Sequence, residues 1–176
     1  MGGSNGSMFP MRYLVRERAF AAGEDFWVSD EAGNEVLRVD AQALRAHRPV
    51  FSLLDGSGAV VTTIRRDLIA MREMMEIERA GAVVATVRKA LVSHIHHRFV
   101  VDLAAGGEME AHGDIAEKEF EIRSGPAVLA RVSRAWSTIR HSYGVEVAPG
   151  QDDPLMLSAV VCLDRIHHDE AVRRLR

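Results

Sequence analysis

Five basic residues occupy equivalent positions in three similar segments, residues 60–68 (VVTTIRRDL), 83–91 (VVATVRKAL) and 128–136 (VLARVSRAW). In each segment an apolar run is followed by a short stretch with one or two basic residues and then by a large apolar residue. The five are Arg65, Arg66, Arg88, Lys89 and Arg134. Guanidinium and ammonium groups that converge can bind phosphate. We therefore predict an anion-binding patch where these runs end, with ordinary surface charge as the alternative.

Three histidines, His94, His96 and His97, form the segment that most resembles a metal site. On a strand, His94 and His96 would point to the same face, at a spacing that suits zinc or copper. A site needs further ligands, and no Cys, Asp or Glu lies near them in sequence. We predict an exposed loop and no metal, and keep a metal-dependent enzyme using His94–His97 as a second alternative.

No arrangement of residues typical of catalysis is recognisable. Cys162 lies between Val161 and Leu163, and a thiol buried among apolar side chains is inert. The chain has no glycine-rich phosphate loop, no dinucleotide fingerprint and no serine nucleophile elbow. We therefore predict neither an enzyme nor a cofactor.

Composition excludes several classes of protein. The 22 Lys and Arg residues against 25 Asp and Glu give a net charge of −3, whereas a dedicated nucleic-acid binder shows a basic excess. No apolar run reaches the roughly 18–20 residues of a membrane span. We expect residues 1–10 to be a disordered tail or an expression scar and not a signal peptide. The single cysteine fits a reducing compartment, so we expect a cytoplasmic domain.

Short apolar or alternating runs, separated by turns with glycine, predict strands along most of the chain. Residues 26–28 lead through the turn 30–34 (DEAGN) into 35–39, and 50–54 lead through 55–58 (DGSG) into 59–64. Ten or more strands at this spacing predict a sandwich or a barrel. The three similar segments favour a stack of hairpins, whose edges a barrel would close.

The end of the chain differs from the rest. Residues 152–154 (DDP) predict a helix start, and 155–166 are apolar almost all round. Such a helix must be buried on every side or lie in lipid, and it is short for a bilayer. We predict one domain over residues 11–169, with a central helix at about 153–167 inside a curled sheet and a polar tail at 170–176.

Several motifs in order carry a resemblance to a known family. They are YLVRE (13–17), DFWV (25–28), DEAGN (30–34), ATVRK (85–89), HGD (112–114), ARVSRAW (130–136), YGVEV (143–147) and GQDD (150–153). The chain resembles the LURP-one-related family, in the tubby-like superfamily that includes phospholipid scramblases, from about residue 13 to residue 166. The resemblance implies an all-β fold with one buried helix, a closed antiparallel barrel of about twelve strands around a C-terminal hydrophobic helix.

The resemblance also bears on function. Tubby-like domains bind phosphoinositides through basic side chains, and some relatives are associated with membranes. The lack of a catalytic arrangement and the basic residues at the segment ends favour a non-catalytic binding module, for anionic phospholipid headgroups or for a protein partner, peripheral at a membrane in the first case. A scaffold with no small ligand is the alternative, because fold alone does not fix function.

Overall fold

Twelve strands, a short 3-10 helix and one α-helix make up the described part of the chain. The computed structural model describes residues 10–20, 23–41, 50–67, 74–90 and 98–174. The elements are β1 (Met11–Phe20), β2 (Gly23–Asp30), β3 (Glu35–Ala41), β4 (Val50–Asp55), β5 (Val60–Asp67), β6 (Met74–Arg79), β7 (Ala82–Lys89), β8 (Phe99–Leu103), β9 (Glu108–Asp114), β10 (Glu119–Ser124), β11 (Ala127–Ser133), η1 (Arg134–Trp136), β12 (Ser142–Val147) and α1 (Asp153–Arg174).

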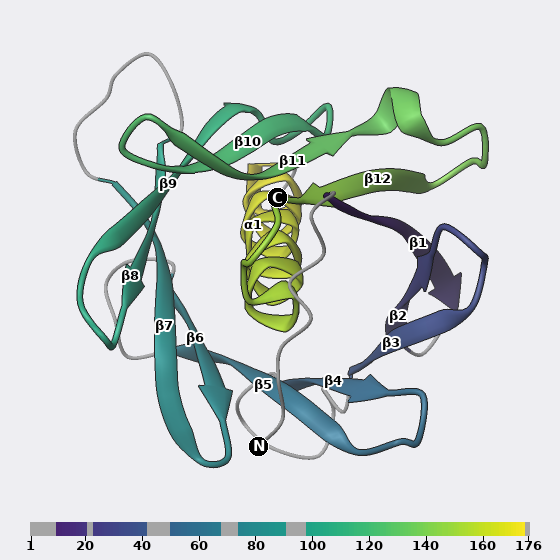
Figure 1. Ribbon diagram of the computed structural model, residues 1–176, viewed down its shortest axis with the longest axis horizontal. Helices are drawn as coiled ribbons and strands as arrows, with labels where there is room; N and C mark the ends of the chain where they lie inside the picture. Colours follow the sequence, from purple (N-terminus) through teal and green to yellow (C-terminus); the bar gives the residue numbers. More distant parts are fainter. Residues whose placement is uncertain (1–9, 21–22, 42–49, 68–73, 91–97, 175–176) are drawn as a thin grey trace.

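The strands form one closed antiparallel barrel. Each strand pairs with its neighbours in sequence, and β1 also pairs with β12, which closes the sheet (Figure 1). Val15 of β1 lies opposite Val28 of β2 on one side and Tyr143 of β12 on the other. Full closure leaves no unpaired strand edge. The predicted fold, a closed barrel of about twelve strands, is confirmed.

Alternation of side chains fixes which face of each strand is buried. In β4, Phe51 and Leu53 are buried while Ser52 between them is partly exposed, and β7 repeats the pattern with Ala85 and Val87. Successive side chains of a strand point to opposite faces. The buried apolar residues of these strands therefore line the inside of the barrel.

The helix α1 occupies the centre of this ring (Figure 1). It lies against β5, β6, β7 and β12. Its buried apolar residues point in all directions around the helix axis and are Met156, Leu157, Ala159, Val160, Val161, Cys162, Leu163 and Ile166. A helix that is apolar all round is stable in water only when it is surrounded. The predicted burial of this helix is therefore confirmed.

Polar contacts fix the position of α1 along the barrel. Arg79 of β6 donates two hydrogen bonds to Asp152, at 2.7 and 2.9 Å, and Asp152 Oδ1 accepts the backbone N–H of Leu155 and so caps the helix. Deeper inside, Ser158 Oγ donates to the carbonyl of Pro154 and lies 2.7 Å from Thr62 Oγ1. Ser158 has one hydroxyl proton, so the Thr62 hydroxyl must donate to Ser158 Oγ.

The helix is longer than the sequence predicts. It begins at Asp153, as expected, but continues past residue 167 to Arg174 and includes residues 170–174 of the predicted polar tail. His168 is exposed, whereas Asp169 is partly buried and forms an ion pair with Arg66 of β5 at 2.8 Å. This contact joins residues far apart in sequence, and it explains why local polarity alone ended the helix too early.

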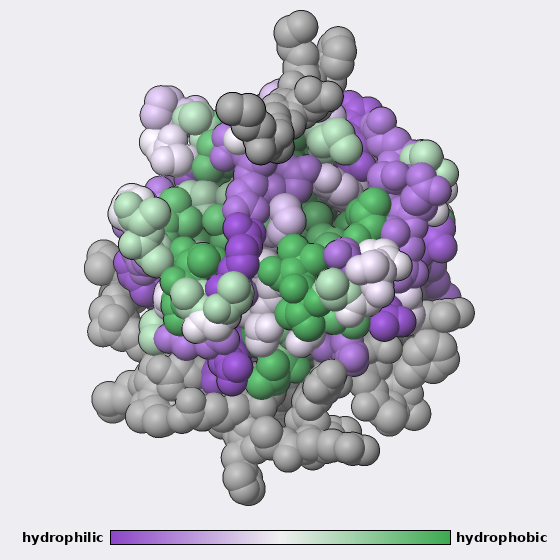
Figure 2. All heavy atoms as spheres, turned by 60° about the horizontal axis from the view of Figure 1, so that its bottom comes forward, coloured by the Kyte–Doolittle hydropathy of each residue, from purple (hydrophilic) through white to green (hydrophobic). Residues whose placement is uncertain are grey.

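The outer face of the barrel is mixed in character. Figure 2 shows one side of it, with hydrophobic side chains in patches between hydrophilic ones. Among the described residues, the large hydrophobic side chains that are exposed are Met11, Val60, Val83, Trp136 and Ile139. No helix within the described ranges is long and apolar enough to cross a membrane.

Candidate functional site

The two ends of the barrel differ in their connections. Tight turns join β2 to β3, β4 to β5, β6 to β7, β8 to β9 and β10 to β11, and we call this the hairpin end. The odd-numbered strands finish at the opposite end, the loop end, where the longer connections lie. Helix α1 begins at the hairpin end, next to Arg79, and its last turns reach the loop end, next to Arg66. All five predicted anion-binding residues lie at or near the loop end.

Two of these five residues face outward and are paired. Arg65 of β5 lies with its Nε 2.8 Å from Glu78 of β6. Arg88 of β7 donates to Asp102 of β8, with Nε 2.5 Å from Oδ2 and Nη2 3.2 Å from Oδ1. This hydrogen bond raises the pKa of Arg88 further above its ordinary value. Both guanidinium groups therefore form ion pairs with the neighbouring strand on the outer face of the sheet.

The other three residues have different surroundings. Arg66 faces the interior and pairs with Asp169 of α1, and Lys89 shares the inner face of β7 with Val87. Arg134 begins η1, is exposed and lies 3.7 Å from Glu117. The strand alternation therefore divides the five bases between the two faces of the sheet, and they do not form a single ring.

A concave pocket opens at the loop end beside the last turns of α1, and we call it the mouth pocket. Its volume is about 830 Å³. It is lined by Phe26, Ala116, Lys118, Arg134, Ser137, Thr138, Ile139, Arg140, His141, Ser142, Tyr143, Asp164, Arg165, His167, His168 and Ala171. Four of these residues are Lys or Arg and three are His, whereas Asp164 is the one carboxylate among them. The pocket is therefore strongly basic in a chain whose net charge is negative.

The single carboxylate of the mouth pocket is already engaged. Lys118 lies in the turn between β9 and β10 with a positive φ of 59°, and it is buried. It forms an almost fully buried ion pair with Asp164 of α1, and its ammonium lies 5.4 Å above the ring of Tyr143. Since a buried carboxylate is stable only when paired, Asp164 is held in place by Lys118.

Two arginines at the rim of the pocket, Arg134 and Arg140, have few charged partners among the described residues. Arg140 forms no ion pair or side-chain hydrogen bond with another described residue. Arg134 has only the exposed Glu117, at 3.7 Å. Arg165 of α1 lies with its guanidinium 4.9 Å from the centre of the Phe51 ring. The rim thus contains guanidinium groups, and Ser137 and Thr138 of the same pocket lining add two hydroxyl groups.

Hydrogen bonds order the segment that carries most of the rim, residues 134–142. Glu119 Oε1 accepts from the backbone N–H of Arg134 and from the hydroxyl of Ser133, both at 2.9 Å. Ser142 Oγ donates to the carbonyl of Ile139 and contacts Ser137 Oγ. The rim is therefore built on a hydrogen-bonded turn, which holds its side chains in place.

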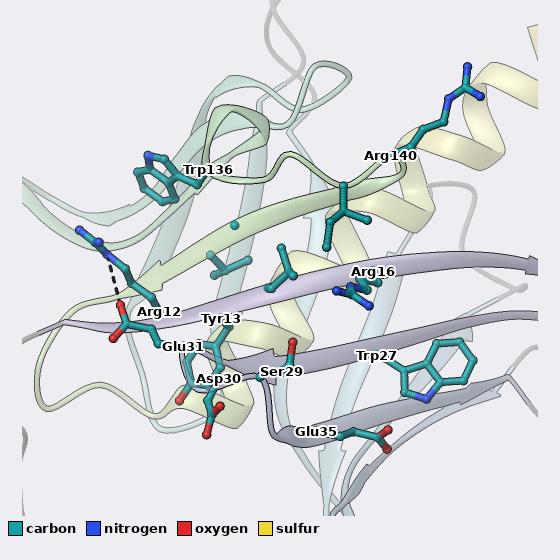
Figure 3. Close-up of a pocket in the computed structure, with 15 residues that line it drawn as sticks. Arg12, Tyr13, Arg16, Trp27, Ser29, Asp30, Glu31, Glu35, Trp136 and Arg140 are labelled. Atoms are coloured by element: carbon teal, nitrogen blue, oxygen red, sulfur yellow. Dashed lines mark ion pairs between the residues drawn. The ribbon is translucent and has the colours of Figure 1, made fainter.

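A second hollow, the outer groove, lies on the other side of the same segment (Figure 3). Its floor is the outward face of β12, β1 and β2, and its volume is about 870 Å³. Its lining includes both tryptophans of the chain and comprises Arg12, Tyr13, Leu14, Arg16, Trp27, Ser29, Asp30, Glu31, Gly33, Glu35, Trp136, Ile139, Arg140, Gly144 and Val145. Three arginines meet three carboxylates, so the outer groove is electrically balanced and the mouth pocket is not.

The remaining candidate residues show no catalytic arrangement among the described parts of the chain. Cys162 is fully buried, and burial raises the pKa of its thiol far above the ordinary value. No group of three His, Cys, Asp or Glu side chains within the described ranges could hold a metal ion. His94, His96 and His97 lie outside the described residues.

Of the five residues predicted from the sequence, Arg134 lines the mouth pocket and the other four do not. Lys118, Arg140 and Arg165 come from a turn, a loop and the helix, which no repeat relates to one another. One local signal was available, because residues 134–142 (RAWSTIRHS) contain two arginines and a histidine but no Asp or Glu. That composition is typical of an anion-facing segment.

Comparisons with known proteins agree with this architecture. The family model described as LURP-one-related matches residues 11–164. Protein YxjI of Bacillus subtilis (strain 168) is 23% identical over 157 residues, which cover 89% of this chain and 94% of that protein. A crystal structure of an Arabidopsis thaliana protein has a TM-score of 0.68 at 22% identity, covering 92% and 94% of the two chains, and so shows the same fold. With a family model that spans most of its length, the chain belongs to the LURP-one-related family.

Proposed function

We propose that this protein is a non-catalytic binding module whose mouth pocket receives a phosphate-bearing anion, such as the headgroup of an anionic phospholipid. One observation carries the proposal: a concave site is lined by four Lys or Arg side chains, and Lys118 already engages its one carboxylate. A concave site whose lining has more positive than negative side chains attracts anions over a distance and concentrates them there.

The side chains of the rim suit phosphate. The guanidinium of Arg140 is planar and can donate two parallel hydrogen bonds to phosphate oxygens, and Arg134 offers the same geometry on the same segment. The hydroxyl of Thr138 can donate to a remaining oxygen. Because the segment is already ordered, little conformational entropy is lost when the anion binds.

The proposal retains Arg134 from the predicted patch and replaces most of the rest. Arg65 and Arg88 each have a carboxylate partner on the neighbouring strand and point away from the barrel interior. They provide a matched control, because they carry the same charge as Arg134 and Arg140 on the same molecule.

Isothermal titration with inorganic pyrophosphate and with glycerol 3-phosphate tests the proposal at low salt. We expect Arg134→Gln with Arg140→Gln to weaken binding by at least about tenfold, since a charge-assisted hydrogen bond contributes about 1.5–3 kcal/mol. Arg65→Gln with Arg88→Gln should leave the affinity unchanged. No binding by the wild type, or loss of binding only in the control, would overturn the proposal.

The competing hypothesis is a scaffold that binds a protein and no small ligand. It predicts that both anions fail to bind and that a stoichiometric protein partner copurifies with the chain. The balanced charge of the outer groove and its two tryptophans suit such a surface, since Trp and Arg are common at the centres of protein interfaces. The pyrophosphate titration separates the two hypotheses directly.

A further inference from the structure

The segment between β11 and β12, residues 134–142, exposes apolar side chains beside bases, and we call it the tip. Trp136 is 49% exposed and Ile139 is 42% exposed. The same segment carries Arg134, Arg140 and His141, and it has no Asp or Glu. In Figure 1 this segment projects away from the ring of strands.

The exposure of Trp136 is built into the fold. Its Cβ and Cε3 pack so closely on Gly144 of β12 that a Cβ added to this glycine would lie 2.8 and 3.1 Å from them. One edge of the indole is therefore held on the strand while the rest faces solvent. Since the serine hydrogen bonds also fix Ile139, both apolar side chains are presented on a rigid turn.

The tip also joins the two hollows. Arg140 and Ile139 line both the mouth pocket and the outer groove, and Trp136 lines the groove. Figure 3 shows Trp136 and Arg140 on the same segment, with Arg140 directed away from the groove floor. The tip therefore borders both the basic mouth pocket and the outer groove.

We propose that the tip docks on an anionic lipid bilayer, with Trp136 and Ile139 entering the boundary between headgroups and acyl chains. Arg134 and Arg140 stay among the lipid phosphates. The proposal rests on the anion binding proposed for the mouth pocket and names the bilayer as the source of the anion. Indole rings favour the membrane interface, and arginine can keep its charge in water while its stem contacts apolar groups.

The chemistry of the tip favours a bilayer over a protein partner. Two exposed apolar side chains are a small area, whereas a stable protein interface buries about 1,200–2,000 Å² in total. A bilayer needs no shape complementarity, and it combines apolar depth with a negative surface that attracts bases. The tip itself contains no carboxylate that an anionic surface would repel.

Cosedimentation with vesicles tests the proposal. The vesicles are phosphatidylcholine alone and phosphatidylcholine mixed with phosphatidylglycerol. We expect binding to the mixed vesicles, weakened more than tenfold by Trp136→Ser with Ile139→Ser. Val60→Ser with Val83→Ser is the matched control, because it removes exposed apolar side chains at the hairpin end and should change nothing. Equal binding by the tip variant and the wild type would overturn the proposal.

Fluorescence reports insertion separately from binding. In a Trp27→Phe background, Trp136 is the one remaining tryptophan. On mixed vesicles its emission should shift to the blue and be quenched by lipids with brominated acyl chains, and an unchanged, unquenched emission would contradict insertion. Pyrophosphate titration of the wild type and of the tip variant separates the two proposals. If the wild type binds pyrophosphate but not vesicles, the bilayer proposal alone is wrong. If it binds vesicles but not pyrophosphate, the proposed anion site in the mouth pocket is wrong.

Discussion

Replacing Val160 by aspartate places a carboxyl group in the centre of the barrel. Val160 is 1% exposed on α1 and lies within the core that surrounds the helix. The change removes the burial of the valine side chain, about 1.5–3 kcal/mol, and leaves a carboxyl group without a partner, which adds several kcal/mol. The total is comparable with the whole stability of a domain, about 5–15 kcal/mol.

Two matched variants calibrate this loss. Val160→Ala removes two carbon atoms without adding charge, and should cost about 2–3 kcal/mol, or about 4–12 °C in melting temperature for a chain of this size. Val60→Asp makes the same substitution as Val160→Asp at a valine that is 59% exposed on β5. It should cost at most about 1 kcal/mol.

Thermal unfolding followed by circular dichroism compares these variants. We expect Val160→Asp to be unfolded or to melt far below Val160→Ala, and Val60→Asp to melt close to the wild type. If Val160→Asp melted together with Val60→Asp, the helix would not be enclosed by the sheet, and the reasoning that puts α1 inside the barrel would be refuted.

Three further predictions concern polar contacts, packing and reactivity. The hydrogen bonds from Arg79 lower the pKa of Asp152, so the stabilisation they give is complete above the unfolded pKa of about 3.9 and is lost as the pH falls through the lower folded value. In urea unfolding, Asp152→Asn should therefore be less stable than the wild type at neutral pH, and its stability should depend less on acid. Equal curves for the two proteins would contradict this. Gly144→Ala should push Trp136 off β12, change the tryptophan emission and cost about 1–3 kcal/mol, whereas an unchanged spectrum would show that the indole does not pack there. Burial raises the pKa of Cys162, so Ellman's reagent should react with it only in denaturant, and fast reaction in the native protein would disprove its burial.

Much of the fold could be predicted because its causes are local. Alternation such as that of Phe51 and Leu53 indicates half-buried strands, and the apolar run around Val160 indicates a helix that must be surrounded. The exact end of the helix could not be predicted, because the pairing of Asp169 with Arg66 depends on the position of β5.

The candidate site could be predicted only in part, because it depends on three-dimensional placement. Arg65 and Arg66 are adjacent in sequence, yet the strand geometry sends them to opposite faces of the sheet. Lys118 is buried against Asp164 of α1 and Tyr143 of β12, and both partners lie far from it in sequence. The mouth pocket forms where this turn, the tip and α1 meet.

The most direct test of the anion-binding proposal is the mapping of backbone amide shifts by nuclear magnetic resonance while pyrophosphate is added. We expect the shifts to gather in the tip, in the turn that holds Lys118 and in α1 around Arg165, and to saturate together. Shifts confined to β5 and β7 around Arg65 and Arg88, or no shifts at all, would contradict it.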